Sequence, residues 1–311
     1  MVTTHSQKDS QTNIQKTKEN SLFLKELEKR VLLFDGAMGT EIQNHNPTIE
    51  DYNGKEGCNE YLVLTKPEII ESIHESYLKA GCDVVETDTF GGSRHKLGEY
   101  GIADKVYEVN FQAAQIARKA AEKYSSPDKP RFVAGSMGPT GFLPSSDDPD
   151  LGNITFGELA DMFGEQAKAL VEGDVDVLLI ETSQDILEVK AAIFGIHRYF
   201  QESGQYVPLI AQVTLDVSGR MLLGTDIGSA LTTLETIGVD IVGMNCSTGP
   251  EHMREPARYL CENTELKISC VPNAGLPINQ DGLAVYPLKP DEMASEMVDF
   301  VSQFGVNIIG G

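Results

Sequence analysis

The chain has 311 residues, of which 41% are hydrophobic and 23% charged, and its formal net charge is -22. This composition is typical of a soluble globular protein, no apolar run approaches the roughly 18 residues of a membrane span, and the negative field disfavours nucleic acid. We therefore expect no membrane and no nucleic acid as a partner. The length fits one βα barrel of roughly 250 residues plus insertions.

The first 20 residues are rich in Gln, Ser, Thr, Asn and Lys and lack the apolar segment of a secretory signal. We expect a disordered N-terminal arm over residues 1–20 and a folded domain over residues 21–311. The five cysteines show no CxxC spacing, and they are Cys58, Cys82, Cys246, Cys261 and Cys270. Without an export signal, these thiols predict a reduced, cytoplasmic protein.

Eight short apolar runs alternate with longer segments of helical periodicity, a pattern typical of successive βα units. The expected strands are residues 31–34, 84–87, 132–135, 177–180, 209–213, 241–244, 268–271 and 306–309. The expected helices are residues 67–80, 105–123, 156–172, 186–200, 229–237, 251–263 and 290–304. Seven helices between eight strands predict an α/β fold, a (β/α)8 TIM barrel whose final helix is missing from this chain.

Two helix starts and the chain end support this pattern. Pro67 at a first-turn position costs no hydrogen bond, and Thr155 with Glu158 has capping-box spacing. The chain stops at Gly311, directly after the eighth strand, where a helix should cover the barrel. We expect a bare stripe there, and a barrel truncated from a longer protein.

Two acidic residues stand at strand ends, where this fold carries its chemistry. Asp35 follows the first expected strand, and Glu181 ends the fourth. Together they could bind one cation, and the lack of a neighbouring basic residue favours an ammonium ligand over a phosphorylated sugar. The structural alternatives are an ordinary Asp-Gly turn at Asp35 and an ion pair at Glu181.

The segment after Asp35 could bind the other end of such a ligand. Backbone N–H groups of a turn over Gly36, Ala37, Met38 and Gly39, which Thr40 follows, favour an anion such as a carboxylate. An ammonium and a carboxylate site side by side predict a site for an α-amino acid. Further candidates for substrate contacts at strand ends are Thr87, Asp88, Ser136, Asn245 and Asn273.

Cys246 differs from the other cysteines because it directly follows a strand, in a loop bounded by Gly249 and Pro250. A thiol in that position could be a nucleophile, but no His in a matching strand-end motif could serve as its base. It could instead be one ligand of a zinc ion.

Seven strings occur in order at strand ends: DGAMGTEIQ, NEYLVLTKPEIIESIHESYLKAGCDVVETDTFGG, VAGSMGPTG, LLIETSQDILEVKAA, GMNCSTGPE, VPNAGLP and GVNIIGG. They resemble the zinc-dependent homocysteine methyltransferase family, to which the homocysteine-binding domains of cobalamin-dependent methionine synthases belong. The resemblance covers roughly residues 31–311. It implies a (β/α)8 barrel that binds homocysteine and passes its thiolate to a methyl donor.

The resemblance also implies roles for individual residues. Asp35 and Glu181 match the homocysteine-binding acids of the family, and Cys246 matches its first zinc ligand. Two further zinc ligands are adjacent cysteines directly after a Gly-Gly pair, and this chain ends at that pair, Gly310-Gly311. Asp88 departs from the family, which commonly has Asn there.

For the cofactors, the resemblance implies zinc, bound weakly or not at all by residues 1–311, which would leave this fragment inactive. The methyl donor would be methylcobalamin, recharged by 5-methyltetrahydrofolate. No Asp-x-His-x-x-Gly cobalamin string occurs here, so folate-binding and cobalamin-binding modules would lie elsewhere. Two alternatives stay open: a stand-alone homocysteine methyltransferase using S-methylmethionine or betaine, and a non-catalytic amino-acid-binding domain.

Overall fold

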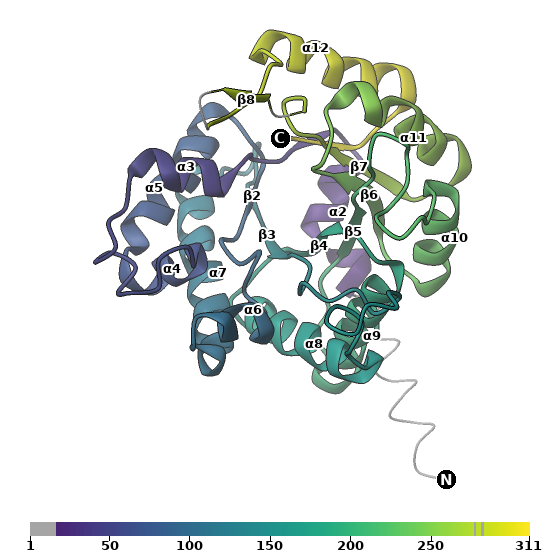
Figure 1. Cartoon of the computed structure of the whole chain (residues 1–311). Coiled ribbons are helices and arrows are strands. Elements are labelled where there is room, and N and C mark those ends of the chain that lie inside the picture. Colours follow the sequence, from purple (N-terminus) through teal and green to yellow (C-terminus); the bar gives the residue numbers. More distant parts are fainter. Residues whose placement is uncertain (1–16, 277, 281–282) are drawn as a thin grey trace.

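The computed structural model describes residues 17–276, 278–280 and 283–311, which form a ring of eight parallel strands inside a shell of helices (Figure 1). The strands are β1 (Leu32–Leu33), β2 (Val84–Glu86), β3 (Phe132–Met137), β4 (Val177–Ser183), β5 (Leu209–Val213), β6 (Ile241–Asn245), β7 (Lys267–Val271) and β10 (Ile308–Ile309). Their order in the sheet is β1-β10-β7-β6-β5-β4-β3-β2. The predicted barrel is thereby confirmed.

A short seam between β1 and β2 closes the ring. A parallel bridge joins Phe34 to Val84, and the Asp83 N–H donates to the Leu33 carbonyl oxygen at 2.6 Å. The Asp83 carboxylate also accepts a hydrogen bond from Arg30 Nη1 at 2.8 Å. Because the first strand is held on both sides, the residue that follows it is fixed at the mouth of the barrel.

Seven long helices connect the strands in the described part of the chain. They are α5 (Pro67–Ala80), α7 (Val106–Tyr124), α8 (Phe156–Glu172), α9 (Ile186–Ser203), α10 (Ile227–Ile237), α11 (Pro250–Asn263) and α12 (Pro290–Asp299). The helix start at Pro67 and the capping box of Thr155 and Glu158 are confirmed. The segment predicted as one helix to residue 304 divides into α12 and a π-helix, η3 (Phe300–Phe304). None of these helices is long and apolar enough to cross a bilayer.

Several shorter elements were not predicted, because they lie in segments that the βα alternation treats as connections. They are α2 (Leu22–Leu27), α3 (Met38–His45), η1 (Asn59–Tyr61), α4 (Leu62–Thr65), α6 (Arg94–Glu99), η2 (Ala103–Lys105) and an antiparallel hairpin of β8 (Ile278–Gln280) and β9 (Leu283–Val285). The predicted arm falls mainly on residues 1–16, outside the described residues. Residues 17–20 are helical, so the arm prediction was wrong for them.

Strand ends differ from the prediction where pairing differs. The first and last strands are shorter, since β10 pairs with β1 and β7 over only two residues each. The third and fourth extend further, and β4 shifts register against β5 between Ile180 and Ser183. This irregularity lies next to the predicted acid, Glu181.

Two apolar layers hold the barrel. Outward-facing strand residues such as Val85 and Leu178 are fully buried under the helices. Inward-facing residues fill the base, where Phe23 and Leu27 of α2 close it from below. At Gly195, α9 approaches α8 so closely that a Cβ would overlap the Ala160 carbonyl oxygen.

One stripe of the barrel lacks such a cover. Leu33 on β1 is 41% exposed, whereas Val85 on β2 and Leu178 on β4 are fully buried. No helix follows β10 in this chain, and Leu33 lies on the neighbouring strand. The outer face of β1 is therefore less covered at Leu33 than the outer faces of β2 and β4.

Candidate active site

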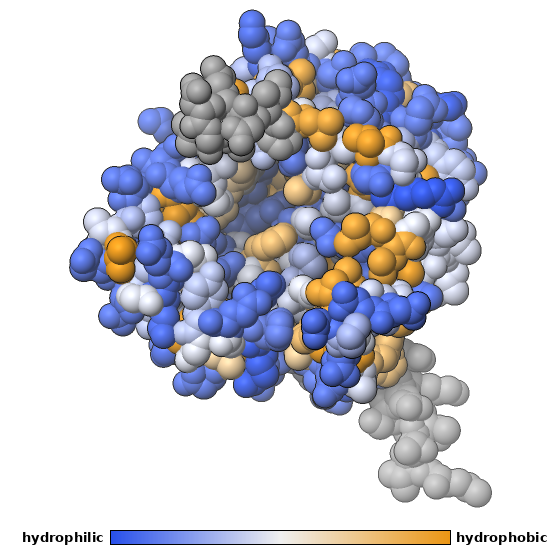
Figure 2. Space-filling view, viewed as in Figure 1, coloured by the Kyte–Doolittle hydropathy of each residue, from blue (hydrophilic) through white to orange (hydrophobic). Residues whose placement is uncertain are grey.

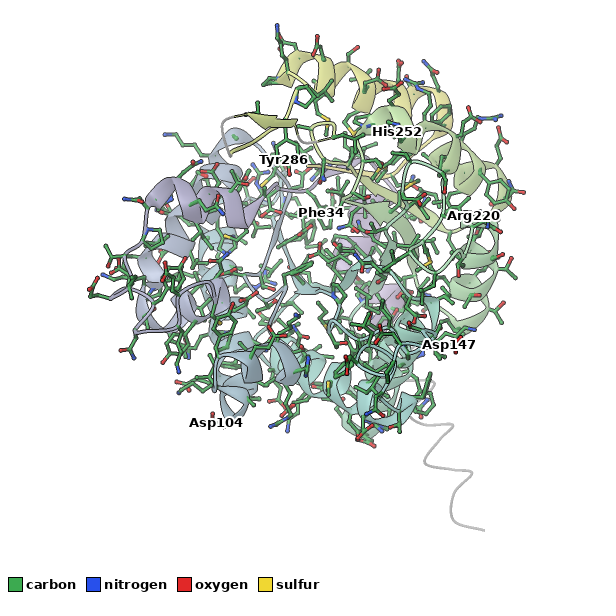
Figure 3. All side chains as sticks on the ribbon, viewed as in Figure 1. Phe34, Asp104, Asp147, Arg220, His252 and Tyr286 are labelled. Atoms are coloured by element: carbon green, nitrogen blue, oxygen red, sulfur yellow. The ribbon has the colours of Figure 1, made fainter. Side chains whose placement is uncertain are left out.

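The inside of the barrel changes character from base to mouth. Its base is apolar, with inward residues Leu32, Phe34, Val84, Phe132, Ala134, Val177, Leu179, Ile210, Ile241 and Ile308. Because strand side chains alternate, the inward positions nearer the mouth include Glu86, Ser136, Glu181, Gln212 and Asn245. Figure 2 shows this face hollowed over the strand ends, with hydrophilic residues in the hollow. Figure 3 shows Phe34 within the ring, and Asp104 and Arg220 at its periphery.

Asp35 directly follows β1 and Phe34, and it is 5% exposed. Both of its carboxylate oxygens accept the Glu86 N–H, at 3.2 and 3.1 Å. Burial raises the pKa of Asp35 well above its usual value, and the charge of Glu181 raises it further, although hydrogen bonds from the backbone oppose the shift. Asp35 is thus an acid whose ionised form lacks a counter-charge.

Glu181 approaches from β4 and is 9% exposed. Its carboxylate accepts hydrogen bonds from Ser136 Oγ at 2.5 Å, from Asn245 Nδ2 at 3.0 Å and from Thr182 Oγ1 at 3.3 Å. Burial nevertheless raises its pKa. Three donors fix the position of this carboxylate, and none of them is a cation.

Glu86 is a third acid that our sequence reasoning missed. Its pKa is raised well above its usual value, first by burial and then by the charges of Glu181 and Asp35. No described residue donates a hydrogen bond to its carboxylate. The alternation of side chains along the strand could have indicated Glu86, because it stands two residues after Val84 and so shares the inward face of β2.

The three acids have no basic partner. None of Asp35, Glu86 and Glu181 forms an ion pair with any Lys, Arg or His of the described residues. Carboxylates that repel one another in a buried space are costly unless a cation joins them or some are protonated. The structure therefore brings the two predicted acids together, excludes the ion-pair alternative for Glu181 within the described chain, and favours a cationic ligand.

The segment after Asp35 is a helix start as well as a turn. Met38 begins α3, and its N-cap residue Ala37 makes no side-chain hydrogen bond. The N–H groups of Met38, Gly39 and Thr40 donate to no acceptor among the described residues. A helix N-terminus with free donors attracts anions. The segment predicted as an anion-binding turn is thus an uncapped helix start that closely follows Asp35.

Cys246 follows β6 and is partly exposed at the mouth. Its backbone is left-handed, with φ 61°, and its N–H donates to the Val271 carbonyl oxygen at 3.1 Å. Gly311 lies nearby in the ring, since its N–H donates to the Asp35 carbonyl oxygen and its Cα packs against the Pro272 carbonyl. Cys246 and the Gly310-Gly311 pair thus lie at the same face of the barrel.

Cys246 does not complete a metal centre with the residues described here. No group of three or more His, Cys, Asp or Glu side chains in the described ranges could hold a metal ion. One thiolate is too few for a zinc site, which takes three or four protein ligands. The described residues thus supply only one of the thiolate ligands that a zinc site of this kind needs.

The remaining candidates for substrate contacts make different contacts at the strand ends. Thr87 Oγ1 accepts the Ser136 N–H at 3.0 Å and so braces β2 against β3. The Asn273 N–H donates to the Thr248 carbonyl oxygen and joins the loops after β6 and β7. Gly36 approaches Tyr77, whose hydroxyl would lie 3.2 Å from a Cβ at that position.

Asp88 lies apart from the three acids. It is 5% exposed, and its Oδ2 atom has no hydrogen-bond partner among the described residues. Burial raises its pKa well above the usual value, and the charge of Glu60 adds to this. Glu60 is itself engaged, since it accepts the Gly91 N–H at 2.6 Å. A buried carboxyl without a donor destabilises the folded state when it is ionised.

We expect Asp88→Asn to raise the free energy of unfolding by about 1–3 kcal/mol at pH 7.5. The folded-state pKa of Asp88 is raised, so its stabilising effect is complete at low pH and is lost as pH rises through that pKa. The gain in the free energy of unfolding should therefore be smaller at pH 5 than at pH 7.5. Urea unfolding at both pH values measures it, with the exposed Asp104→Asn as control. A gain equal at both pH values, or a loss, would contradict this account.

Fold and site together define a class of protein. It is a parallel βα barrel with three buried acids, a free helix start and one thiol at its mouth. Comparison with known proteins agrees. Residues 32–311 match the family model described as homocysteine S-methyltransferase. The chain belongs to the homocysteine S-methyltransferase family.

Two relatives are methionine synthases. That of Mycobacterium tuberculosis is 43% identical over 285 residues, covering 92% of this chain and 24% of the relative. That of Mycobacterium leprae is 42% identical over 288 residues, with 93% and 24% covered. The chain thus spans about a quarter of the length of these relatives.

A solved structure shares the fold. The homocysteine methyltransferase MmuM from Escherichia coli, in its metallated form, superposes with a TM-score of 0.72 at 20% identity, over 92% of each chain. Its oxidized form gives the same TM-score. At this identity the likeness establishes the barrel fold.

Proposed function

We propose that this chain is the homocysteine-binding and activating module of a methionine synthase. In this proposal a methyl group passes from methylcobalamin, recharged by 5-methyltetrahydrofolate, to the thiolate of zinc-bound homocysteine, giving methionine. The observation that carries it is the group of three acids without a basic partner, next to a free helix start, in a barrel of this family.

The acids and the helix start would hold the amino-acid end of homocysteine. Its ammonium fits between Asp35, Glu86 and Glu181, where it relieves their repulsion, and its carboxylate fits the N–H groups that begin α3. Charge-assisted hydrogen bonds of this kind are the stronger ones, about 1.5–3 kcal/mol each. Burial at the mouth strengthens them further, because water competes less.

Cys246 would meet the sulfur end. A free thiol with a pKa of about 8.5 is only about 3% ionised at pH 7. A zinc ion, when bound, supplies the charge that keeps such a thiol deprotonated. We propose that Cys246 is one zinc ligand and that two cysteines following Gly310-Gly311 in the natural protein are the others. The metallated form of the MmuM structure supports a metal in this family.

Zinc binding by residues 1–311 alone should be weak, because only one of three thiolates is present. We expect less than about 0.2 zinc per chain after dialysis, measured by atomic absorption, and no further loss in Cys246→Ser. A single tightly held zinc per chain would contradict this prediction.

The proposal for the methyl donor rests on the two related methionine synthases. Both methionine synthases are about four times longer than the matched segment, so modules for cobalamin and folate would lie in the rest of such a protein. The natural full-length protein, loaded with zinc, tests this. We expect methionine to form from homocysteine with methylcobalamin, and not with S-methylmethionine or betaine. Formation only with one of the latter two would overturn the proposed donor, and no methionine with any donor would overturn the activity.

A further inference from the structure

Asn245 lies between the acidic pocket and the thiol, and all of its amide hydrogens are in use. Its Nδ2 donates to Glu181 Oε2 at 3.0 Å and to Thr182 Oγ1 at 2.9 Å, while its Oδ1 accepts the Thr182 N–H at 2.7 Å. The side chain is 6% exposed. No amide hydrogen is left for a substrate, so a direct contact is not the role that these bonds favour.

Two strained backbone segments meet at this side chain. Thr182 has φ 57°, in the register shift of β4, and Cys246 and Ser247 have φ 61° and 62° directly after β6. A left-handed conformation costs a β-branched residue such as Thr the most. Such strain persists only where surrounding contacts hold it, and it gathers at functional sites. Here the Asn245 side-chain oxygen accepts the Thr182 N–H, and Asn245 directly precedes Cys246 in the chain.

The backbone of this segment is braced from both neighbouring strands. Thr214 Oγ1, just after β5, donates to the Asn245 carbonyl oxygen at 2.9 Å. On the other side, the Cys246 N–H donates to the Val271 carbonyl oxygen of β7 at 3.1 Å. The side chain of Asn245 is then the link from this braced segment to the Glu181 carboxylate.

We propose that Asn245 is a positioning residue that fixes the spacing between the Glu181 carboxylate and the Cys246 thiol. This inference rests on the proposed function, in which one amino acid presents its ammonium to the first group and its sulfur to the second. A fixed spacing discriminates by chain length. It should favour homocysteine over cysteine, which is shorter by one methylene group.

The test measures binding to residues 1–311 by calorimetry, with L-2-aminobutyrate, L-homocysteine and L-cysteine as ligands. L-2-aminobutyrate lacks sulfur and reports on the amino-acid end alone. We expect Asn245→Ala to weaken its binding about 10-fold, and to reduce the preference for homocysteine over cysteine at least about 5-fold. The same substitution at the exposed Asn263, on α11, is the matched control and should change neither quantity.

A double-mutant cycle separates positioning from general damage. If Asn245 acts through Glu181, adding Asn245→Ala to Glu181→Gln should weaken L-2-aminobutyrate binding by less than about 2-fold more. Additive losses, or wild-type binding and discrimination in Asn245→Ala, would overturn the proposal. If Asn245→Ala fails to fold, Asn245→Ser, which keeps one hydrogen-bonding group, takes its place in every arm.

A ligand-free measurement keeps this inference distinct from the proposed function. The rate at which Cys246 reacts with Ellman's reagent, taken as the difference from Cys246→Ser, should change at least about 5-fold in Asn245→Ala and remain unchanged in Asn263→Ala. If the wild type binds none of the three amino acids, the proposed function fails. If the wild type binds them and the Cys246 rate is the same in both Asn variants, the positioning role fails.

Discussion

Glu181→Gln should weaken L-homocysteine binding at least about 30-fold, the effect of leaving an ammonium without its buried carboxylate. The same change should raise the free energy of unfolding of the ligand-free protein by about 1–3 kcal/mol at pH 7.5. Removing one of three mutually repelling acids explains the gain, and losing the ammonium partner explains the weaker binding. Calorimetry and urea unfolding measure the two effects.

The expected change in the free energy of unfolding depends on pH. Because the pKa values of Asp35, Glu86 and Glu181 are raised in the folded protein, their stabilising effect is complete at low pH and decreases as pH rises through the folded-state values. Glu181→Gln should flatten that decrease between pH 5 and pH 8. The exposed Glu50→Gln is the control and should leave both binding and the pH profile unchanged. A variant less stable than wild type at pH 7.5 would count against the acidic pocket as described.

Cys246→Ser should lower methyl transfer to homocysteine by at least about 1,000-fold in the natural full-length protein, and leave L-2-aminobutyrate binding within 2-fold of wild type. The reason is that a serine hydroxyl does not ionise to replace the thiolate, while the acids and α3 still hold the amino-acid end. Methionine formation and calorimetry measure the two quantities. Cys261→Ser on α11 is the matched control, and full activity is expected there. Activity above a tenth of wild type in Cys246→Ser would contradict the proposed role of this thiol as a zinc ligand.

The acidic mouth implies a compromise between stability and binding. Three carboxyls with raised pKa values destabilise the empty protein at neutral pH, yet the same carboxyls are the partners that an ammonium needs. Sites of this kind are commonly held in place at the expense of stability. Ligand binding should therefore raise the melting temperature more at neutral pH, where the acids are ionised, than at low pH, where they are protonated.

Much of the barrel was predictable, because alternation of apolar runs with helical periods is a local property. The strand ends at Asp35, Glu181 and Cys246 followed from the same pattern. The start of α3 was predicted only as a turn, since Gly36 and Gly39 are typical of turns and nothing in the segment resembles an N-cap side chain. The hairpin β8–β9 escaped detection because its strands are only three residues long.

The missed parts of the site depend on contacts between distant residues. Glu86 could have been found from its alternation with Val84, but its pKa depends on Asp35 and Glu181 across the barrel. The role of Asn245 depends on a left-handed Thr182, 63 positions away along the chain. No local pattern predicts that conformation for a β-branched residue, so only the folded structure shows it.

The central claim is that the mouth of this barrel binds homocysteine by its ammonium, its carboxylate and its sulfur. The most direct measurement is calorimetric titration of the chain with L-homocysteine, with 4-mercaptobutyrate, which lacks the ammonium, and with 3-mercaptopropylamine, which lacks the carboxylate. We predict that L-homocysteine binds and that each truncated compound binds at least about 100-fold more weakly, since each leaves buried polar groups unpaired. Binding of 4-mercaptobutyrate as tight as that of L-homocysteine would contradict the claim.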